Sequence, residues 1–180
     1  AAFHTLNSRA MVRRYARNHG KTNKDVTVIV AHMGGGSSVS LHRNGLVIDV
    51  NDALGGDGPF SPERAGSVPA FPLIEMCFSG KYTKAEIKKM LVGKGGAVAH
   101  LGTNDFRGIV TRAEAGDQDC ATFLKAFCIS VAKYIGSMAT VVSGKVDAIV
   151  LTGGIAYSKY ITSEIASMVQ FIAPVEVYGG

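Results

Sequence analysis

Tryptophan is absent from this 180-residue sequence, only 18% of the residues are charged, and no tract of low complexity interrupts the chain. Disordered chains combine low hydrophobicity with high net charge, whereas 47% of these residues are hydrophobic. We therefore expect one ordered domain with a single core.

Cysteine is scarce as well. Cys77, Cys120 and Cys128 lie in apolar or helical context and are odd in number. That number and context disfavour a disulfide framework or a zinc site. We expect buried, reduced thiols in a cytoplasmic protein.

Long uninterrupted apolar runs are also missing, because Lys133, Lys145 and Asp147 break the longest ones. We expect no membrane-spanning segment and no signal peptide. The formal net charge is +5, but the basic residues are spread along the chain rather than clustered. This spread favours a small anion over nucleic acid as the partner.

The most informative stretch runs from residue 26 to residue 66. Residues 27–32 form an apolar, β-branched run that predicts a buried strand, and Gly34-Gly35-Gly36-Ser37-Ser38 follows it directly. Consecutive glycines leave backbone N–H groups open to an anion. Asn44-Gly45 then predicts a type I′ hairpin within residues 39–50. A glycine turn that only tightens the sheet is the alternative.

This order does not match the two common phosphate loops. A Walker loop requires Lys-Ser/Thr and then a helix after its glycines, and a dinucleotide fingerprint also requires a helix there. A glycine turn between two hairpin strands is instead how the sugar kinase, Hsp70 and actin superfamily holds phosphates. Residues 51–66, which contain Asp52, Asp57, Glu63 and Arg64, predict a polar binding loop.

The spacing of apolar residues along the sequence predicts the remaining helices and strands. Helices are expected at residues 5–19, 70–79, 83–91 and 121–142, and strands at 146–151 and 171–178. A polar turn at 102–107 opens another helix, with Asp105 a plain cap or a ligand contact and Arg107 facing ligand or solvent. The order predicts a layered α/β domain. Small residues in the longest helix permit packing against a second copy of the chain.

A second glycine signal, Gly153-Gly154, follows the strand at 146–151 and leads into a helix. Nucleotides bind at such strand ends in α/β sheets, although close packing of helix on strand explains the pair equally well. His4 stands just before the first helix, and by itself a lone histidine there is more often structural than catalytic.

Taken together, these motifs resemble those of the butyrate kinases, in the acetate kinase branch of the sugar kinase, Hsp70 and actin superfamily. The matching blocks cover essentially the whole chain. They are Phe3-His4, residues 32–38, 49–54, 58–66, 77–83, 93–96, 101–105 and 146–157. Gly35 stands where acetate kinases place asparagine, which favours the butyrate branch.

The resemblance implies a ribonuclease H-like layered domain, with a mixed sheet flanked by helices. It implies phosphorylation of a short-chain fatty acid by ATP with Mg²⁺, with Arg64 catalytic and His4 donating a hydrogen bond. The implied phosphate contacts are His32, Gly34, Gly35, Gly36, Ser37 and Ser38. The implied adenosine contacts are Asp105, Arg107, Gly153, Gly154 and Ile155, and Phe3 and Pro62 would line the acyl pocket.

The chain also departs from that family. We expect residues 1–180 to be an incomplete carboxy-terminal, nucleotide-binding domain, with the family's amino-terminal domain and its metal-associated glutamate missing. The isolated chain is then expected to bind nucleotide weakly and not to turn over. A homo-oligomer is expected. The alternatives are a non-catalytic nucleotide-binding or dimerisation domain and a kinase that prefers acetate.

Overall fold

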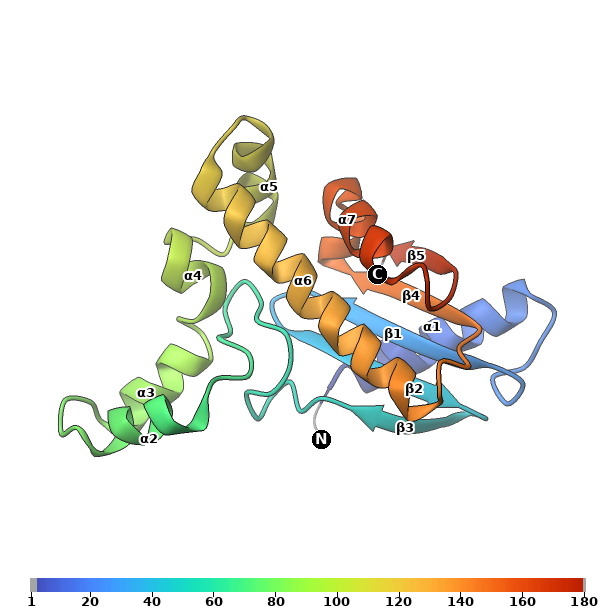
Figure 1. Cartoon of the computed structure of the whole chain (residues 1–180), viewed down its shortest axis with the longest axis horizontal. Coiled ribbons are helices and arrows are strands. Elements are labelled where there is room, and N and C mark those ends of the chain that lie inside the picture. Colours follow the sequence, from blue (N-terminus) through green and yellow to red (C-terminus); the bar gives the residue numbers. More distant parts are fainter. Residues whose placement is uncertain (1–2, 180) are drawn as a thin grey trace.

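The computed structural model describes residues 3–179 as one five-stranded mixed sheet with helices on both faces (Figure 1). The strands are β1 Thr27–Met33, β2 Ser37–Arg43, β3 Leu46–Val50, β4 Ala148–Gly153 and β5 Val175–Gly179. The helices are α1 Thr5–Asn18, α2 Ala70–Phe78, α3 Lys84–Leu91, α4 Gly96–Leu101, α5 Phe106–Glu114, α6 Gln118–Val141 and α7 Lys159–Val169, with a 3₁₀ turn η1 at Gly154–Tyr157.

The strand order is β3-β2-β1-β4-β5. β1, β2 and β3 form an antiparallel meander, and β4 and β5 continue the sheet parallel to β1. Asn44 (φ 54°) and Gly45 (φ 78°) both have positive φ, which confirms the predicted type I′ turn. This mixed sheet confirms the ribonuclease H-like architecture expected from the resemblance.

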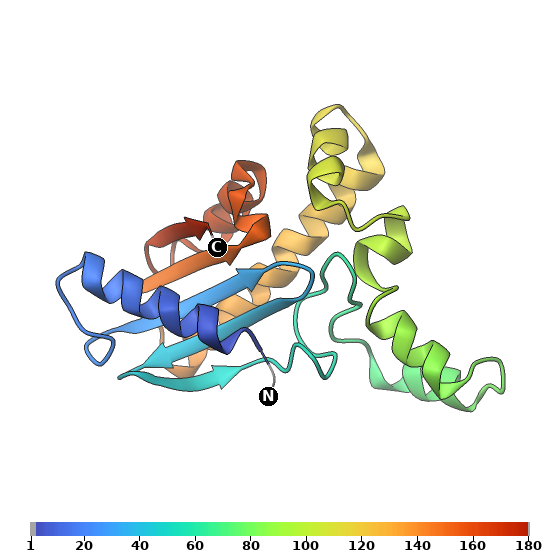
Figure 2. The same cartoon turned by 180° about the vertical axis from the view of Figure 1, so that it is seen from behind.

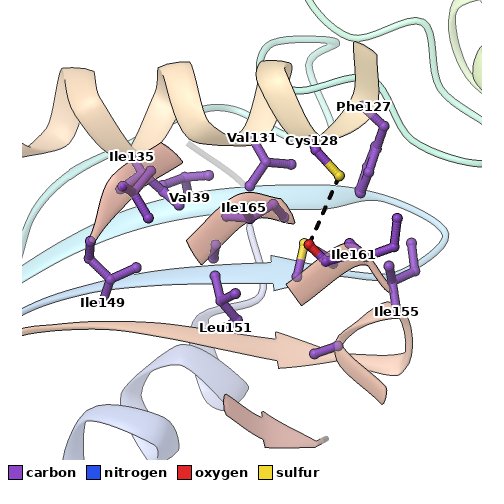
Figure 3. Close-up of a cluster of buried hydrophobic side chains, with 14 of the residues drawn as sticks. Val39, Phe127, Cys128, Val131, Ile135, Ile149, Leu151, Ile155, Ile161 and Ile165 are labelled. Atoms are coloured by element: carbon purple, nitrogen blue, oxygen red, sulfur yellow. Dashed lines mark hydrogen bonds between the residues drawn. The ribbon is translucent and has the colours of Figure 1, made fainter. Parts of the chain in front are cut away.

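Each face of the sheet has its own apolar cluster, because side chains alternate along every strand. On one face, Ile29, Ile149 and Leu151 pack under α6 and α7 (Figure 3). On the other, α1 lies across the sheet (Figure 2) and covers Val28, Val30 and Val150. The two layers hold the carboxyl ends of β1 and β4 at one edge of the domain.

Helix α2 does not pack as its sequence indicates. Its apolar side chains indicate a packed helix, yet none of its residues is buried, and Phe71 and Phe78 are 83% and 85% exposed. The other apolar residues are Leu73, Ile74 and Met76. α2 and α3 lie away from the sheet, at the left of Figure 1. The expectation for Cys77 is wrong for the same reason: this thiol is exposed, whereas Cys120 and Cys128 are buried, and all three are free.

Helix α6 also corrects an expectation. It is the one helix in the described part of the chain that is long and apolar enough, by length and composition, to cross a membrane. Its two lysines do not lower the mean hydropathy enough to break the run. In the fold, Phe127, Val131 and Ile135 instead bury its inner stripe against the sheet. Ala139, one of the small residues expected to contact a second copy, is buried in the same cluster.

Other element boundaries moved by a few residues. The helix expected at residues 83–91 is α3, and Thr83 and Glu86 form a capping box at its start. The run at residues 97–101, which had no assigned structure, is helix α4. β5 begins only at Val175, because Pro174 cannot donate a ladder hydrogen bond.

The inner stripe of α6 should dominate the stability of the domain. Ile135 is fully buried and Ile129, on the same helix, is 41% exposed. We expect Ile135→Ala to lower the free energy of unfolding by about 3 kcal/mol, because it removes buried methyl groups and leaves a cavity. Ile129→Ala is the matched control and should cost less than about 1 kcal/mol. Urea denaturation of both variants measures the difference, and equal losses would contradict this packing.

Candidate functional site

The two glycine turns predicted from the sequence meet at one edge of the sheet. Gly34–Gly36 connects β1 to β2, and Gly153 ends β4, the parallel neighbour of β1. Gly153 has a φ of 90°, and a Cβ there would overlap the carbonyl group of Met33. The close packing considered as an alternative is therefore real at Gly153, and it is what brings the two turns together.

An open cleft of about 730 Å³ lies between these turns and helix α5. This volume is within the range of pockets that hold nucleotide-sized ligands. It contains seven of the residues singled out in the sequence: Gly34, Gly35, Pro62, Asp105, Arg107, Gly154 and Ile155. The remaining lining residues are Glu63, Asn104, Phe106, Val110, Thr111, Tyr157 and Ser158.

The α5 side of the cleft carries both polar and charged groups. Asp105 is the helix cap, accepting a hydrogen bond from the Gly108 amide at 3.1 Å, so the simpler interpretation of this residue is correct; it lines the cleft as well. Arg107 is exposed at the cleft. Asn104 Nδ2 donates to Glu63 Oε1 at 2.6 Å and links this side to the polar loop.

The first glycine turn is stabilised by one hydrogen bond within the turn and by another from the polar loop. The Gly34 amide donates to the Gly36 carbonyl at 3.0 Å, and Ser61 Oγ donates to the Gly35 carbonyl at 2.7 Å. The Ser37 hydroxyl is buried and has no hydrogen-bond partner in the described part of the chain. The polar loop thus fixes the turn without covering Gly35, which is exposed.

Arg64 lies over this turn. A Cβ on Gly36 would approach Arg64 Cζ to 2.7 Å, so only glycine leaves room for the guanidinium group. Arg64 Nη1 donates to the Ala53 carbonyl at 2.5 Å, and the Arg64 backbone bridges to Val92. These contacts fix one end of the guanidinium group.

Two histidines stack beside Arg64. The rings of His4 and His32 are 3.7 Å apart and nearly parallel, and His4 Nδ1 is 2.9 Å from Ser38 Oγ. Burial, followed by the positive charge of Arg64, lowers the pKa of His4. Burial and the nearby His4 lower the pKa of His32 to about 4. Both rings are therefore mainly neutral at pH 7.

The loop that carries Arg64 is anchored to the body of the domain through Asp57. This carboxylate accepts hydrogen bonds from Ser67 Oγ at 2.7 Å and from Tyr134 of α6 at 3.0 Å. The Ser67 bond is the main cause of a lowered Asp57 pKa. Asn51 is buried and joins the same loop to β2 by accepting from the Val39 amide at 2.7 Å.

The predicted residues fall into two groups on either side of the glycine turn. The first group lines the cleft. The second group lies around the glycine turn and consists of His4, His32, Gly36, Ser38 and Arg64. Pro62 is buried and lines the cleft, and Phe3 is not among the lining residues, so the expected acyl-pocket pair is not brought together there. Sequence reasoning placed Glu63 in the polar binding loop without giving it a role, and it missed Asn104 and Tyr157, although all three lie inside blocks that it had quoted.

With this geometry established, comparison with known proteins decides the family. The profile described as "Acetokinase family" matches residues 2–176. This chain belongs to the acetokinase family.

Named relatives in this family are identical to the chain at about half of the aligned positions. It is 54% identical over 178 residues to a "Probable butyrate kinase" of Clostridium botulinum, and 53% identical to "Butyrate kinase 1" of Clostridium acetobutylicum. Each match covers 99% of the chain and 50% of the relative. The chain therefore spans about half the length of the curated relatives that it matches.

Solved structures show the same fold. The acetate kinase of Porphyromonas gingivalis superimposes with a TM-score of 0.90 at 21% identity, covering 99% of this chain and 51% of that one. A propionate kinase from Francisella tularensis gives 0.84 at 24% identity, covering 98% and 52%. A ROK hexokinase from Thermus thermophilus gives 0.54 at 14%, covering 92% and 58%. The fold is thus that of carboxylate and sugar kinases.

The contact of Gly153 with Met33 can be tested by a pair of alanine substitutions. Gly153→Ala should lower the free energy of unfolding by about 2 kcal/mol or more, because its Cβ meets backbone at a positive φ. The adjacent Gly154→Ala should change it by less than about 1 kcal/mol, since a Cβ there has open space. Urea denaturation compares the two, and a Gly153→Ala variant as stable as Gly154→Ala would refute the close approach.

Proposed function

We propose that this chain is the nucleotide-binding part of an ATP-dependent carboxylate kinase that converts a short-chain fatty acid, butyrate or a similar acid, to its acyl phosphate. The observation that carries the proposal is the open cleft between the two glycine turns, with Arg64 over the first of them. Identity above 50% to a named butyrate kinase supports butyrate over acetate.

The cleft offers a nucleotide two different surfaces. The exposed Gly35 and its neighbours present backbone at the carboxyl end of β1, where phosphates can approach closely. Gly154, Ile155, Asp105 and Arg107 line the far side, which we assign to adenosine. We assign the phosphates to residues 34–38, with His32 beside them, and keep the acyl pocket at Phe3 and Pro62 as a proposal.

Arg64 is the proposed catalytic residue. Phosphoryl transfer depends mainly on positioning and charge stabilisation, and a guanidinium group is well suited to both. Because His4 and His32 are mainly neutral, Arg64 supplies the positive charge of this cluster. His4 is proposed to donate a hydrogen bond to the same transferring group.

Mg²⁺ would enter with the nucleotide. No group of three or more His, Cys, Asp or Glu residues is placed to hold a metal within residues 3–179. In kinase sites Mg²⁺ is usually bound through substrate phosphates and water, with one or two carboxylates from the protein. The metal would supply charge neutralisation on the phosphates, and the chain's own part is to cradle and orient them.

Half of each relative has no counterpart in this chain, so we propose that the present residues form one side of the site. The missing side would come from an amino-terminal domain, and a cytoplasmic location and a homo-oligomer are proposed with it. On this view the chain alone binds ATP weakly and has no kinase turnover.

Isothermal titration of the purified 180-residue chain with ATP, and a hydroxamate assay for butyryl phosphate, test this directly. We expect weak ATP binding and no product, with full-length C. acetobutylicum butyrate kinase 1 as the positive control. Absence of any ATP binding would overturn the nucleotide assignment. Turnover at the rate of the control would overturn the half-site proposal, and a preference for acetate in the completed enzyme would favour the acetate alternative.

The role of Arg64 is testable in a full-length kinase that carries this chain as its second half. Arg64→Lys should lower kcat about 100-fold with little change in the KM for butyrate, because the charge remains but its planar fork is lost. Arg112→Lys is the control, since Arg112 pairs with Asp117 on the surface. Steady-state kinetics measures both; a normal kcat for Arg64→Lys would remove Arg64 from the mechanism.

A further inference from the structure

His32 lies where the sheet, helix α1 and the first glycine turn meet. It shares the α1 side of β1 with Val28 and Val30, because residues two apart point the same way. Across the sheet it is in register with Ser38 of β2 and Thr152 of β4. Thr152 is buried, and its hydroxyl has no hydrogen-bond partner among the described residues.

The first turn of α1 holds the His32 ring in two ways. The His4 ring stacks on its face, and Asn7, three residues further along the helix, contacts its edge. Figure 2 shows α1 lying across this face of the sheet. The Asn7–His32 contact joins Oδ1 and Nδ1 at 3.0 Å.

This contact determines which ring nitrogen carries the proton. An amide oxygen can only accept a hydrogen bond, so Nδ1 of His32 is the donor and Nε2 keeps a lone pair. Since burial keeps the ring neutral at pH 7, the position of its one proton decides what the ring offers a ligand. The contact of Asn7 with Nδ1 therefore determines whether Nε2, on the opposite edge of the His32 ring, donates or accepts a hydrogen bond.

The opposite edge lies beside the first glycine turn. A Cβ placed on Gly34 would lie 3.5 Å from His32 Nε2. With the Asn7 oxygen facing Nδ1, Nε2 is an acceptor and would repel a phosphoryl oxygen. To donate to that oxygen, Nε2 must carry the proton, and Asn7 must then present its Nδ2 amide group to Nδ1.

We propose that Asn7 is a positioning residue that sets the tautomer of His32 and exchanges it when a phosphate binds. Half a turn of the Asn7 amide replaces the acceptor Oδ1 by the donor Nδ2. His32 then gives its Nδ1 proton to water and takes one at Nε2, with no net change in charge. The exchange rests on the proposed role of residues 34–38 in phosphate binding.

The groups around the ring allow this exchange without a change of charge. His4, from the start of α1, and Arg64, from the polar loop, are the titratable or charged groups that bear on the pair. β2 and β4 present the hydroxyl groups of Ser38 and Thr152, which do not titrate. Burial and the nearby His4 both oppose a positive charge on His32, so a shift of tautomer is the remaining response.

Long-range ¹H–¹⁵N spectra of the histidine rings in the 180-residue chain test the proposal, with inorganic tripolyphosphate as the ligand. We expect the Nδ1–H tautomer in the free chain and the Nε2–H tautomer when tripolyphosphate is bound. Asn7→Leu should abolish the preference for Nδ1–H, because Leu offers the ring no hydrogen-bond partner. Asn7→Asp should raise the pKa of His32, because a carboxylate stabilises the protonated ring.

Asn18→Leu is the matched control. Asn18 lies on the same helix and donates to the Tyr178 hydroxyl at 3.3 Å, away from His32, so this variant should leave the His32 signals unchanged. Circular dichroism confirms that each variant is folded.

The spectra separate failure of this proposal from failure of the proposed function. Two results would show that Asn7 does not set the tautomer of His32, whether or not phosphate binds. One is an Nε2–H tautomer in the free chain, and the other is a tautomer that Asn7→Leu does not change. Tripolyphosphate that binds without moving the proton would overturn the exchange. If tripolyphosphate does not bind, the phosphate assignment and the exchange both fail, and the free-chain spectrum still decides whether Asn7 sets the tautomer.

Discussion

The parallel pairing of β1 with β4 is the constraint on which the rest of the structure depends. It places the carboxyl ends of the two strands side by side, and Gly153 lets their backbones approach at Met33. Each strand end then continues into a glycine turn, and the open space between the turns becomes the cleft. The helices on both faces fix this arrangement by burying alternate sides of the same strands.

The site combines two neutral histidine rings with one positively charged arginine. Burial keeps the histidines neutral, and the positive charge above the glycine turn is concentrated on the guanidinium group of Arg64. The Ala53 carbonyl fixes the orientation of this guanidinium group. A fixed planar guanidinium group directs its hydrogen bonds better than several mobile ammonium groups would. Under the proposed exchange, the neutral His32 ring beside it responds to a ligand by a change of tautomer.

Strong local patterns made much of the fold predictable. Residues 27–33, the Asn44-Gly45 turn and the long stripe of α6 each depend on alternation or turn chemistry that the sequence displays directly, and both glycine turns were found in the same way. The failures have a common cause. Apolar residues of α2 such as Phe71 predict burial, but their exposure depends on where the helix lies. Likewise Asn7 reaches His32 through folding alone, because no short motif marks it.

The strand pairing that creates the cleft also has a kinetic consequence. β1, β2 and β3 are joined by short turns, whereas Val28 must find Ala148 across most of the chain. Closing so long a loop costs entropy before any contact rewards it, and parallel pairings of this kind form slowly. The antiparallel meander of β1, β2 and β3 is therefore expected to form first, before β4 pairs with the other edge of β1. During that interval the unpaired N–H and C=O groups along this edge of β1 can pair with other chains, so the order of synthesis and folding bears on how much protein reaches the native state.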